Sequence, residues 1–162
     1  REPGDLDKNH GTKPLSSRLT VEFEAVSRVA PTDPDIPAVL LVEDDDEDAA
    51  AFDRALAATG ECYELKRCAS AEEAVAMMVG GERPQLLVVD DELRGMNSGT
   101  LFRVVRSRPE WGDPMVYSYT SASGVGDKQI HKPPSVSEVR LALVAAKMAA
   151  LMPLLVATGA LR

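Results

Sequence analysis

The stretch "AVLLVEDDDED" (38–48) decides the fold: five apolar residues are followed at once by six acidic ones. A short, continuous apolar run is typical of a strand that is buried on both faces of a parallel sheet. The acidic residues at 45–48 fit the start of a helix, where capping and the helix dipole favour Asp and Glu. That explanation does not reach Glu43 and Asp44, which finish the strand, so a cation site is the second interpretation.

The rest of the chain repeats this alternation. Further strands are expected at 63–67, 85–89, 114–118 and, as a short candidate, 129–131, and helices at 47–60, 70–81, 99–108 and from 135 to about 150. Buried strands that alternate with helices predict an α/β fold with a parallel sheet covered on both sides.

The connection between the last two predicted strands is shorter than the others. Only "SASGVGDKQIH" (121–131) separates Thr120 from Lys132, and a helical crossover needs about a dozen residues in addition to the strand. We therefore expect the helix at this place, the fourth of the domain, to be shortened or missing. The alternative is that a segment between these two strands is missing from the printed sequence.

The chain divides into three parts. Residues 1–36 predict an N-terminal extension that ends in the Pro-rich linker "PTDPDIP", residues 37–150 form the folded domain, and 151–162 form a C-terminal tail. Within the extension, 15–30 fits helix and strand about equally. Pro153 is expected to end the last helix or to kink it.

Composition excludes several partners. A net charge of −8 argues against nucleic acid, which needs clustered Lys and Arg. No apolar run approaches ~20 residues, so no membrane-spanning helix is expected. Cys62 and Cys68 form neither a metal cage nor a disulfide framework, which favours a reduced, cytoplasmic protein.

The strand ends carry the candidate chemistry. Glu43 and Asp44 follow one predicted strand and Asp90 follows another. If those strands are neighbours, three carboxylates converge in the crevice where such sheets bind ligands, and their hard oxygens suit Mg²⁺. Thr120 and Lys132 follow later strands, and a hydroxyl and an ammonium there could stabilise a phosphoryl group.

Three motifs in this order, "LLVEDD" (40–45), "PQLLVVDDELRGM" (84–96) and "HKP" (131–133), resemble the receiver domain of two-component response regulators. The likeness covers about residues 38–150. It implies a flavodoxin-like, doubly wound sheet of five parallel strands in the order 2-1-3-4-5. It also implies a domain that accepts a phosphoryl group from a histidine kinase or phosphotransfer protein with Mg²⁺, and that is no enzyme beyond self-phosphorylation and self-dephosphorylation.

The resemblance also implies roles for single residues. These are Asp90 as phosphoacceptor, Glu43, Asp44 and Asp90 as metal ligands with the backbone carbonyl of Glu92, Thr120 as switch hydroxyl, and Lys132 as phosphate partner before a cis bond to Pro133. Output through the domain surface, with a homodimer as one form, completes the expectation.

The match has departures. Counting from Pro114 places Tyr119 at the hydroxyl position, so Tyr119, Thr120 and Ser121 all stay candidates for the switch. Gln129 stands where the family usually has an aromatic residue. These departures and the short connection support a second hypothesis, a pseudo-receiver that binds partners without phosphorylation.

A third hypothesis, a phosphatase with an aspartate nucleophile, is disfavoured by the residues after Asp90. Such sites carry Asp two residues further on and then Thr or Val, whereas Glu92 and Leu93 occupy these places.

Overall fold

The computed structural model describes residues 36–122 and 128–159. The elements in chain order are β1 (Ala38–Val42), α2 (Asp46–Ala58), β2 (Glu64–Cys68), α3 (Ala71–Val79), β3 (Leu86–Asp90), α4 (Ser98–Arg106), the 3-10 turn η1 (Pro109–Trp111), β4 (Met115–Thr120), β5 (Gln129–His131) and α5 (Val136–Ala157). The five strands are all parallel in the order β2-β1-β3-β4-β5. The predicted flavodoxin-like fold and strand order are confirmed.

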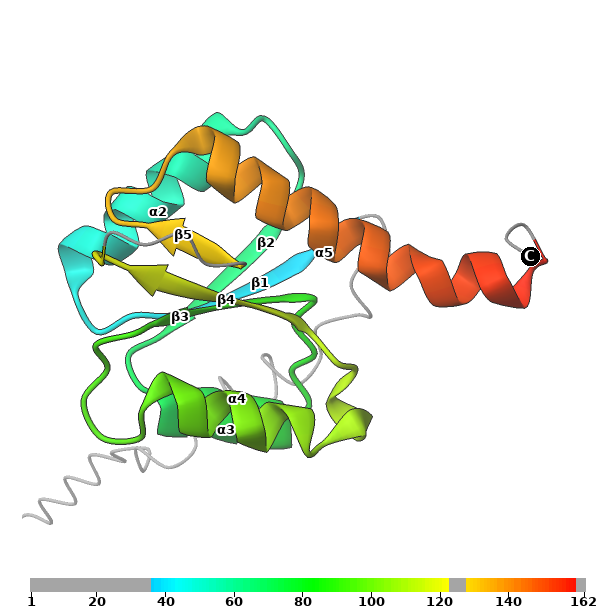
Figure 1. Cartoon of the computed structure of the whole chain (residues 1–162), viewed down its shortest axis with the longest axis horizontal. Coiled ribbons are helices and arrows are strands. Elements are labelled where there is room, and N and C mark those ends of the chain that lie inside the picture. Colours follow the sequence, from blue (N-terminus) through cyan, green and yellow to red (C-terminus); the bar gives the residue numbers. More distant parts are fainter. Residues whose placement is uncertain (1–35, 123–127, 160–162) are drawn as a thin grey trace, which may run out of the picture. The chain divides into compact units, whose positions relative to one another are not determined.

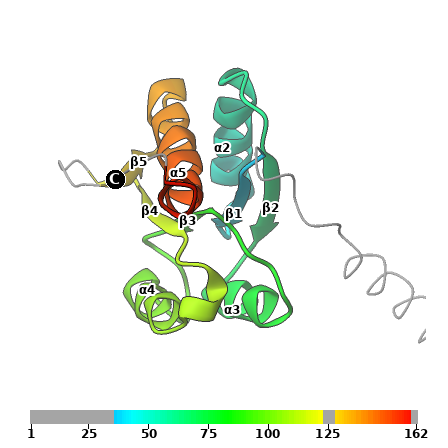
Figure 2. The ribbon, with the colours of Figure 1, turned by 90° about the vertical axis from the view of Figure 1, so that its right-hand side faces the viewer.

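The sheet lies between two helical layers. Figures 1 and 2 show α2 and α5 on one side of the sheet and α3 and α4 on the other. Successive strand residues point to opposite faces, so β1 sends Val39 and Leu41 toward α2 and α5, and Leu40 and Val42 toward α3 and α4. Both faces are therefore apolar, as the continuous apolar run predicts.

Side-chain caps set the helix starts. Asp45, Ser70, Asn97 and Ser135 each accept a hydrogen bond from the backbone N–H three residues ahead. Such caps satisfy an otherwise unpaired N–H group of the first helical turn. The full reciprocal capping box forms at Ser135 and Glu138.

The connection between β4 and β5 is as short as expected. Thr120 ends β4 and Gln129 begins β5, which pairs with it in parallel, so residues 121–128 make the whole link. Among the residues of this link that the structure describes, 121, 122 and 128, none is helical. A shortened or missing fourth helix is confirmed for this part.

The strands themselves are adapted to the short link. Tyr119 and Ile130 are register partners and point into the α2/α5 core. The adjacent positions Ser118 and Gln129, also register partners, therefore point to the α3/α4 side, and both are only half-buried. Neither residue is a large apolar one, so this part of the sheet needs no further helix to cover apolar side chains, although Gln129 Oε1 is buried without a hydrogen-bond partner among the described residues. This favours a real loop over a gap in the printed sequence.

Helix α5 is longer than predicted. It continues through Pro153 to Ala157, so most of the predicted tail 151–162 belongs to it. It is also long and apolar enough to cross a membrane, with a mean hydropathy of 1.9, which the sequence analysis did not expect. Its first half, however, packs into the core of the domain through Val139, Leu143 and Ala146. Residues 1–35 of the predicted extension lie outside the described residues.

Candidate functional site

The site lies where β1 and β3 end. These strands are neighbours, and Val42 pairs with Val89 in the register. The next residues, Glu43 and Asp90, therefore emerge side by side at the carboxyl edge of the sheet. Both side chains are buried, Glu43 completely and Asp90 to 2% exposure. The convergence of carboxylates that the sequence predicts is confirmed.

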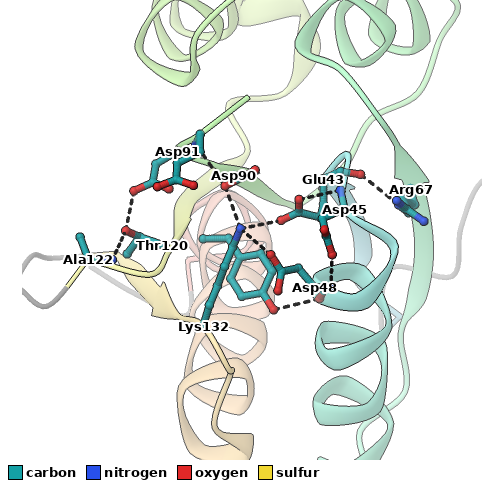
Figure 3. Close-up of polar contacts among 11 residues, drawn as sticks. Glu43, Asp45, Asp48, Arg67, Asp90, Asp91, Thr120, Ala122 and Lys132 are labelled. Atoms are coloured by element: carbon teal, nitrogen blue, oxygen red, sulfur yellow. Dashed lines mark hydrogen bonds and ion pairs between the residues drawn. The ribbon is translucent and has the colours of Figure 1, made fainter. Parts of the chain in front are cut away.

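Lys132, the residue directly after β5, extends its side chain to these acidic side chains. Its Nζ donates hydrogen bonds to Asp90 Oδ1 at 2.9 Å and to Asp48 Oδ2 at 3.1 Å, and lies 2.9 Å from Glu43 Oε2. Figure 3 shows the lysine reaching up from β5 toward all three carboxylates. The peptide bond between Lys132 and Pro133 is cis, as the resemblance implies.

The electrostatics of the cluster are set by burial. Burial raises the pKa of Glu43 to about 7, against hydrogen bonding from the Asp45 N–H and Lys132 that lowers it. Burial disfavours the charged form of Lys132 too, but its bonds to Asp90, Glu43 and Asp48 outweigh this and raise its pKa above the ordinary lysine value. The site therefore holds the Lys132 cation next to one buried carboxyl group, that of Glu43, which is costly to ionise.

The donor set suits a divalent cation. One carboxylate oxygen from each of Glu43, Asp44 and Asp90 can be chosen so that all three lie within 4.8 Å of one another. Glu43 Oε2 is buried, and beyond its ion pair with Lys132 Nζ at 2.9 Å it has no other polar partner among the described residues. A buried oxygen with spare acceptor capacity, next to one exposed carboxylate, is what a Mg²⁺ ion that keeps several waters requires.

Glu92 is placed close to the phosphoacceptor candidate. Its backbone N–H donates to Asp90 Oδ1 at 3.1 Å, which orients the Asp90 carboxylate, and its side chain is exposed. The role of its carbonyl as a metal ligand stays a prediction.

The acidic run after β1 does two things at once. Asp45 caps α2 by accepting from the Asp48 N–H at 2.9 Å, as the helix-start interpretation predicts. Asp48, which that interpretation treated as a capping residue, instead turns its carboxylate toward Lys132.

Two further residues belong to the site: Arg67 was not predicted for it, and Tyr119 was predicted only as an alternative position for the switch hydroxyl. Arg67, at the end of β2, donates to the Glu43 carbonyl oxygen at 3.0 Å and pairs with Asp46 at 2.8 Å. Tyr119 is fully buried, donates its hydroxyl to the Asp48 carbonyl oxygen at 2.9 Å, and places its ring 4.8 Å from Lys132 Nζ. Burial raises the pKa of the Tyr119 hydroxyl, so the ring stays a neutral surface beneath the ammonium.

Thr120 points elsewhere. As the next strand residue after Tyr119 it lies on the opposite face, and its hydroxyl donates to Asp91 Oδ2 and accepts from the Ala122 N–H at 3.0 Å. Figure 3 shows this pair beside the Asp90–Lys132 contact. The structure therefore brings Glu43, Asp44, Asp90 and Lys132 together and places the Thr120 hydroxyl on the neighbouring aspartate.

Comparison with known proteins supports the fold. A putative response regulator from Chloroflexus aurantiacus is 24% identical, with a TM-score of 0.61 over 70% of this chain and 98% of its own. A chemotaxis response regulator of Vibrio cholerae is 17% identical, with a TM-score of 0.57 over 68% and 98%. The signal receiver domain of a histidine kinase from Syntrophus aciditrophicus is 24% identical, with a TM-score of 0.55 over 67% and 91%.

No protein-family model and no curated sequence matches the chain. The likeness to these proteins thus rests on three-dimensional structure alone, namely the five-stranded parallel sheet and its strand order. The domain that residues 36–159 build has the fold of the response regulator receiver domains.

Proposed function

We propose that this chain is a two-component receiver that accepts a phosphoryl group on Asp90 from a histidine kinase or phosphotransfer protein. The observation that carries the proposal is the position of Lys132, whose Nζ lies 2.9 Å from both Asp90 Oδ1 and Glu43 Oε2. A fixed ammonium at this distance can neutralise a phosphoryl oxygen next to the nucleophile.

The proposed reaction transfers a phosphoryl group from a histidine of the donor protein to Asp90. One oxygen of the Asp90 carboxylate forms a bond to phosphorus while the bond between phosphorus and the donor's imidazole nitrogen breaks. The imidazole keeps that electron pair and takes up a proton. The hydrogen bond from the Glu92 N–H holds the carboxylate in one orientation, and Lys132 supplies positive charge to the transferred group.

Mg²⁺ is the proposed cofactor, and Glu43, Asp44 and Asp90 are the side chains that would hold it. When bound it would offset the charge that gathers on the phosphoryl oxygens. The two carboxylates differ in solvent exposure. Glu43 is buried and Asp44 is exposed, so one side of the proposed metal site is closed to water and the other is open.

The test uses acetyl phosphate with Mg²⁺ on the full chain. We expect intact-mass measurement to show one added phosphoryl group, which Asp90→Asn removes. Asp91→Asn is the matched control, because it changes the adjacent, exposed carboxylate and should keep the label. Label retained in Asp90→Asn would contradict the assignment of the phosphoacceptor.

The pseudo-receiver remains the second candidate, and one observation favours it. The Thr120 hydroxyl is occupied by Asp91, and Tyr119 fills the space beneath the lysine with an aromatic ring. A domain in this state could bind partners without a phosphorylation-dependent switch. Lack of any label in the wild-type chain, with the fold intact by circular dichroism, would select this candidate over the first.

A further inference from the structure

The ammonium of Lys132 is shared by three carboxylates. A lysine ammonium carries three N–H bonds, and the oxygens that lie near Nζ are Asp90 Oδ1 at 2.9 Å, Glu43 Oε2 at 2.9 Å and Asp48 Oδ2 at 3.1 Å. Figure 3 shows these three contacts spreading from the one nitrogen. A phosphoryl oxygen can therefore bind Lys132 only if one of the three carboxylates moves away from it.

The three carboxylates differ in how easily they can leave the lysine. The side chain of Glu43 is 0% exposed and that of Asp90 is 3% exposed, whereas the side chain of Asp48 is 39% exposed. A buried carboxylate that loses its cation keeps an uncompensated charge, which is costly. A partly exposed carboxylate exchanges the ion pair for water at little cost. Asp48 is therefore the partner that a new anion can replace.

The backbone of Asp48 is held in place on both sides. Its N–H donates to Asp45 Oδ1 at 2.9 Å, and its carbonyl oxygen accepts from the Tyr119 hydroxyl at 2.9 Å. Neither contact involves the Asp48 carboxylate. The carboxylate can therefore turn into water by rotation of the side chain alone, while the first turn of α2 keeps its position.

Asp48 is also separate from the proposed metal ligands. The carboxylates that lie close enough together to hold a cation are those of Glu43, Asp44 and Asp90. A change at position 48 leaves all three in place. What Asp48 adds is one further negative charge beside the point where a phosphoryl group, itself carrying about two negative charges, would arrive.

We propose that Asp48 is a positioning residue, which holds the Lys132 ammonium in the unphosphorylated chain and which the incoming phosphoryl group must displace. The inference rests on the proposed function, phosphoryl transfer to Asp90. In the exchange, one N–H of Lys132 leaves Asp48 Oδ2 for a phosphoryl oxygen, and the Asp48 carboxylate becomes hydrated. Asp48 thus slows phosphorylation and weakens the binding of any phosphoryl-like anion at Asp90.

The first experiment compares the rates at which acetyl phosphate with Mg²⁺ labels the full chain, measured by intact mass. Asp48→Asn removes the charge but keeps the size of the side chain and both backbone hydrogen bonds. It should take the label about two- to fivefold faster than the wild type, the range expected for the ion pair of a partly exposed carboxylate. Glu47→Gln is the matched control, since Glu47 is an exposed acid of the same helical turn outside the Lys132 ion pairs. It should change the rate by a factor of about 1.5 or less, because solvent screens a charge without direct contact.

The outcomes separate this inference from the proposed function. Equal rates for the wild type and Asp48→Asn, slower labelling of Asp48→Asn, or equal acceleration in Glu47→Gln would each overturn the role of Asp48, while label on Asp90 would leave the proposed function standing. Lack of label in both the wild type and Asp48→Asn would overturn the two together.

The second experiment measures an equilibrium instead of a rate. Beryllium fluoride binds a carboxylate oxygen as a tetrahedral mimic of the phosphoryl group, and calorimetric titration with Mg²⁺ present gives its affinity for the full chain. Asp48→Asn should bind it about two- to fivefold more tightly than the wild type, and Glu47→Gln should match the wild type. A side chain that only stabilised α2 would not tighten this binding when it is replaced. Equal or weaker binding by Asp48→Asn, with its fold intact by circular dichroism, would contradict the proposal.

Discussion

Two regions of the domain, the cluster at the ends of β1 and β3 and the strand pair β4–β5, differ in how closely they follow the receiver pattern. The first brings the carboxylates of Glu43, Asp48 and Asp90 within 3.1 Å of one ammonium, that of Lys132. The second has a link of eight residues, a polar outer face, and a Thr120 hydroxyl that is bound to Asp91. The difference teaches that the charged cluster at one edge of the sheet and the last strand pair beside it can vary separately in one fold.

The largest expected effect tests the cluster. Lys132→Met leaves Glu43 and Asp90 buried together without their cation, which should lower the free energy of unfolding by about 3–5 kcal/mol at pH 8. Urea unfolding measures this. The control Lys66→Met removes an ion pair with Glu82 that is about one-third exposed, and should cost no more than about 1 kcal/mol. Equal losses in the two variants would mean that the buried ion pairs of Lys132 contribute no more to stability than a partly exposed surface ion pair.

The next effect compares the two faces of the short strand β5. Ile130 is fully buried against α5, and Ile130→Ala should cost about 2–5 kcal/mol. Gln129 is its half-buried neighbour on the opposite face, and its Oε1 has no hydrogen-bond partner among the described residues, so Gln129→Ala should change stability by no more than about 0.5 kcal/mol. Thermal and urea unfolding report both. A large loss of stability in Gln129→Ala would show that the Gln129 side chain makes a stabilising contact on its face of the sheet.

A smaller effect concerns Mg²⁺. Binding at ten times the dissociation constant should add about 1.4 kcal/mol to the free energy of unfolding, seen as a rise in melting temperature that EDTA reverses. Glu43→Gln should abolish the rise, whereas Glu47→Gln, an exposed acidic neighbour, should keep it. A rise of equal size in both variants would point to binding elsewhere.

The same carboxylate predicts the pH dependence of that effect. Folding raises the pKa of Glu43 from 4.5 to about 7, so between these values the folded chain holds the proton more tightly than the unfolded chain. Without Mg²⁺, this contribution to stability is present at low pH and falls as pH rises from 4.5 to 7. The Mg²⁺ effect should therefore be larger at pH 8 than at pH 5.5, where a proton competes for the site.

The smallest effect tests the second region. Thr120→Val and Asp91→Ala each remove one partner of the same hydrogen bond. A double-mutant cycle should give a coupling free energy of about 1 kcal/mol. No coupling would mean that the Thr120 hydroxyl does not depend on Asp91. It would then be available to the cluster at the ends of β1 and β3, and the second region would follow the receiver pattern more closely.

Much of the site could be predicted because it lies at the ends of recognisable strands. Glu43, Asp44 and Asp90 stand at places where an apolar run stops, and parallel neighbours bring such ends together. Asp48 and Arg67 could not be assigned in the same way, because helical and strand propensities say nothing about which exposed charge turns toward a buried one. The partner of Thr120 was equally hidden, since it depends on the face from which β4 presents each side chain.

The length of α5 shows a different limit. Pro153 removes one backbone hydrogen bond and argues for an end or a kink, yet the helix continues to Ala157. The apolar residues on both sides of Pro153 have no alternative strand or turn pattern to follow, so the local cost of proline does not decide where the helix ends.

The sequence by itself determined the layered α/β fold, the strand edge that carries the acids, and the lack of room for a helix between β4 and β5. These follow from local patterns, because burial on both faces of a strand, capping and chain length act over a few residues. Only the tertiary structure decided that one ammonium sits among Glu43, Asp48 and Asp90 and that Thr120 belongs to Asp91. Such contacts join residues far apart in the chain, and the packing of the sheet, not any local preference, sets the angle at which they meet.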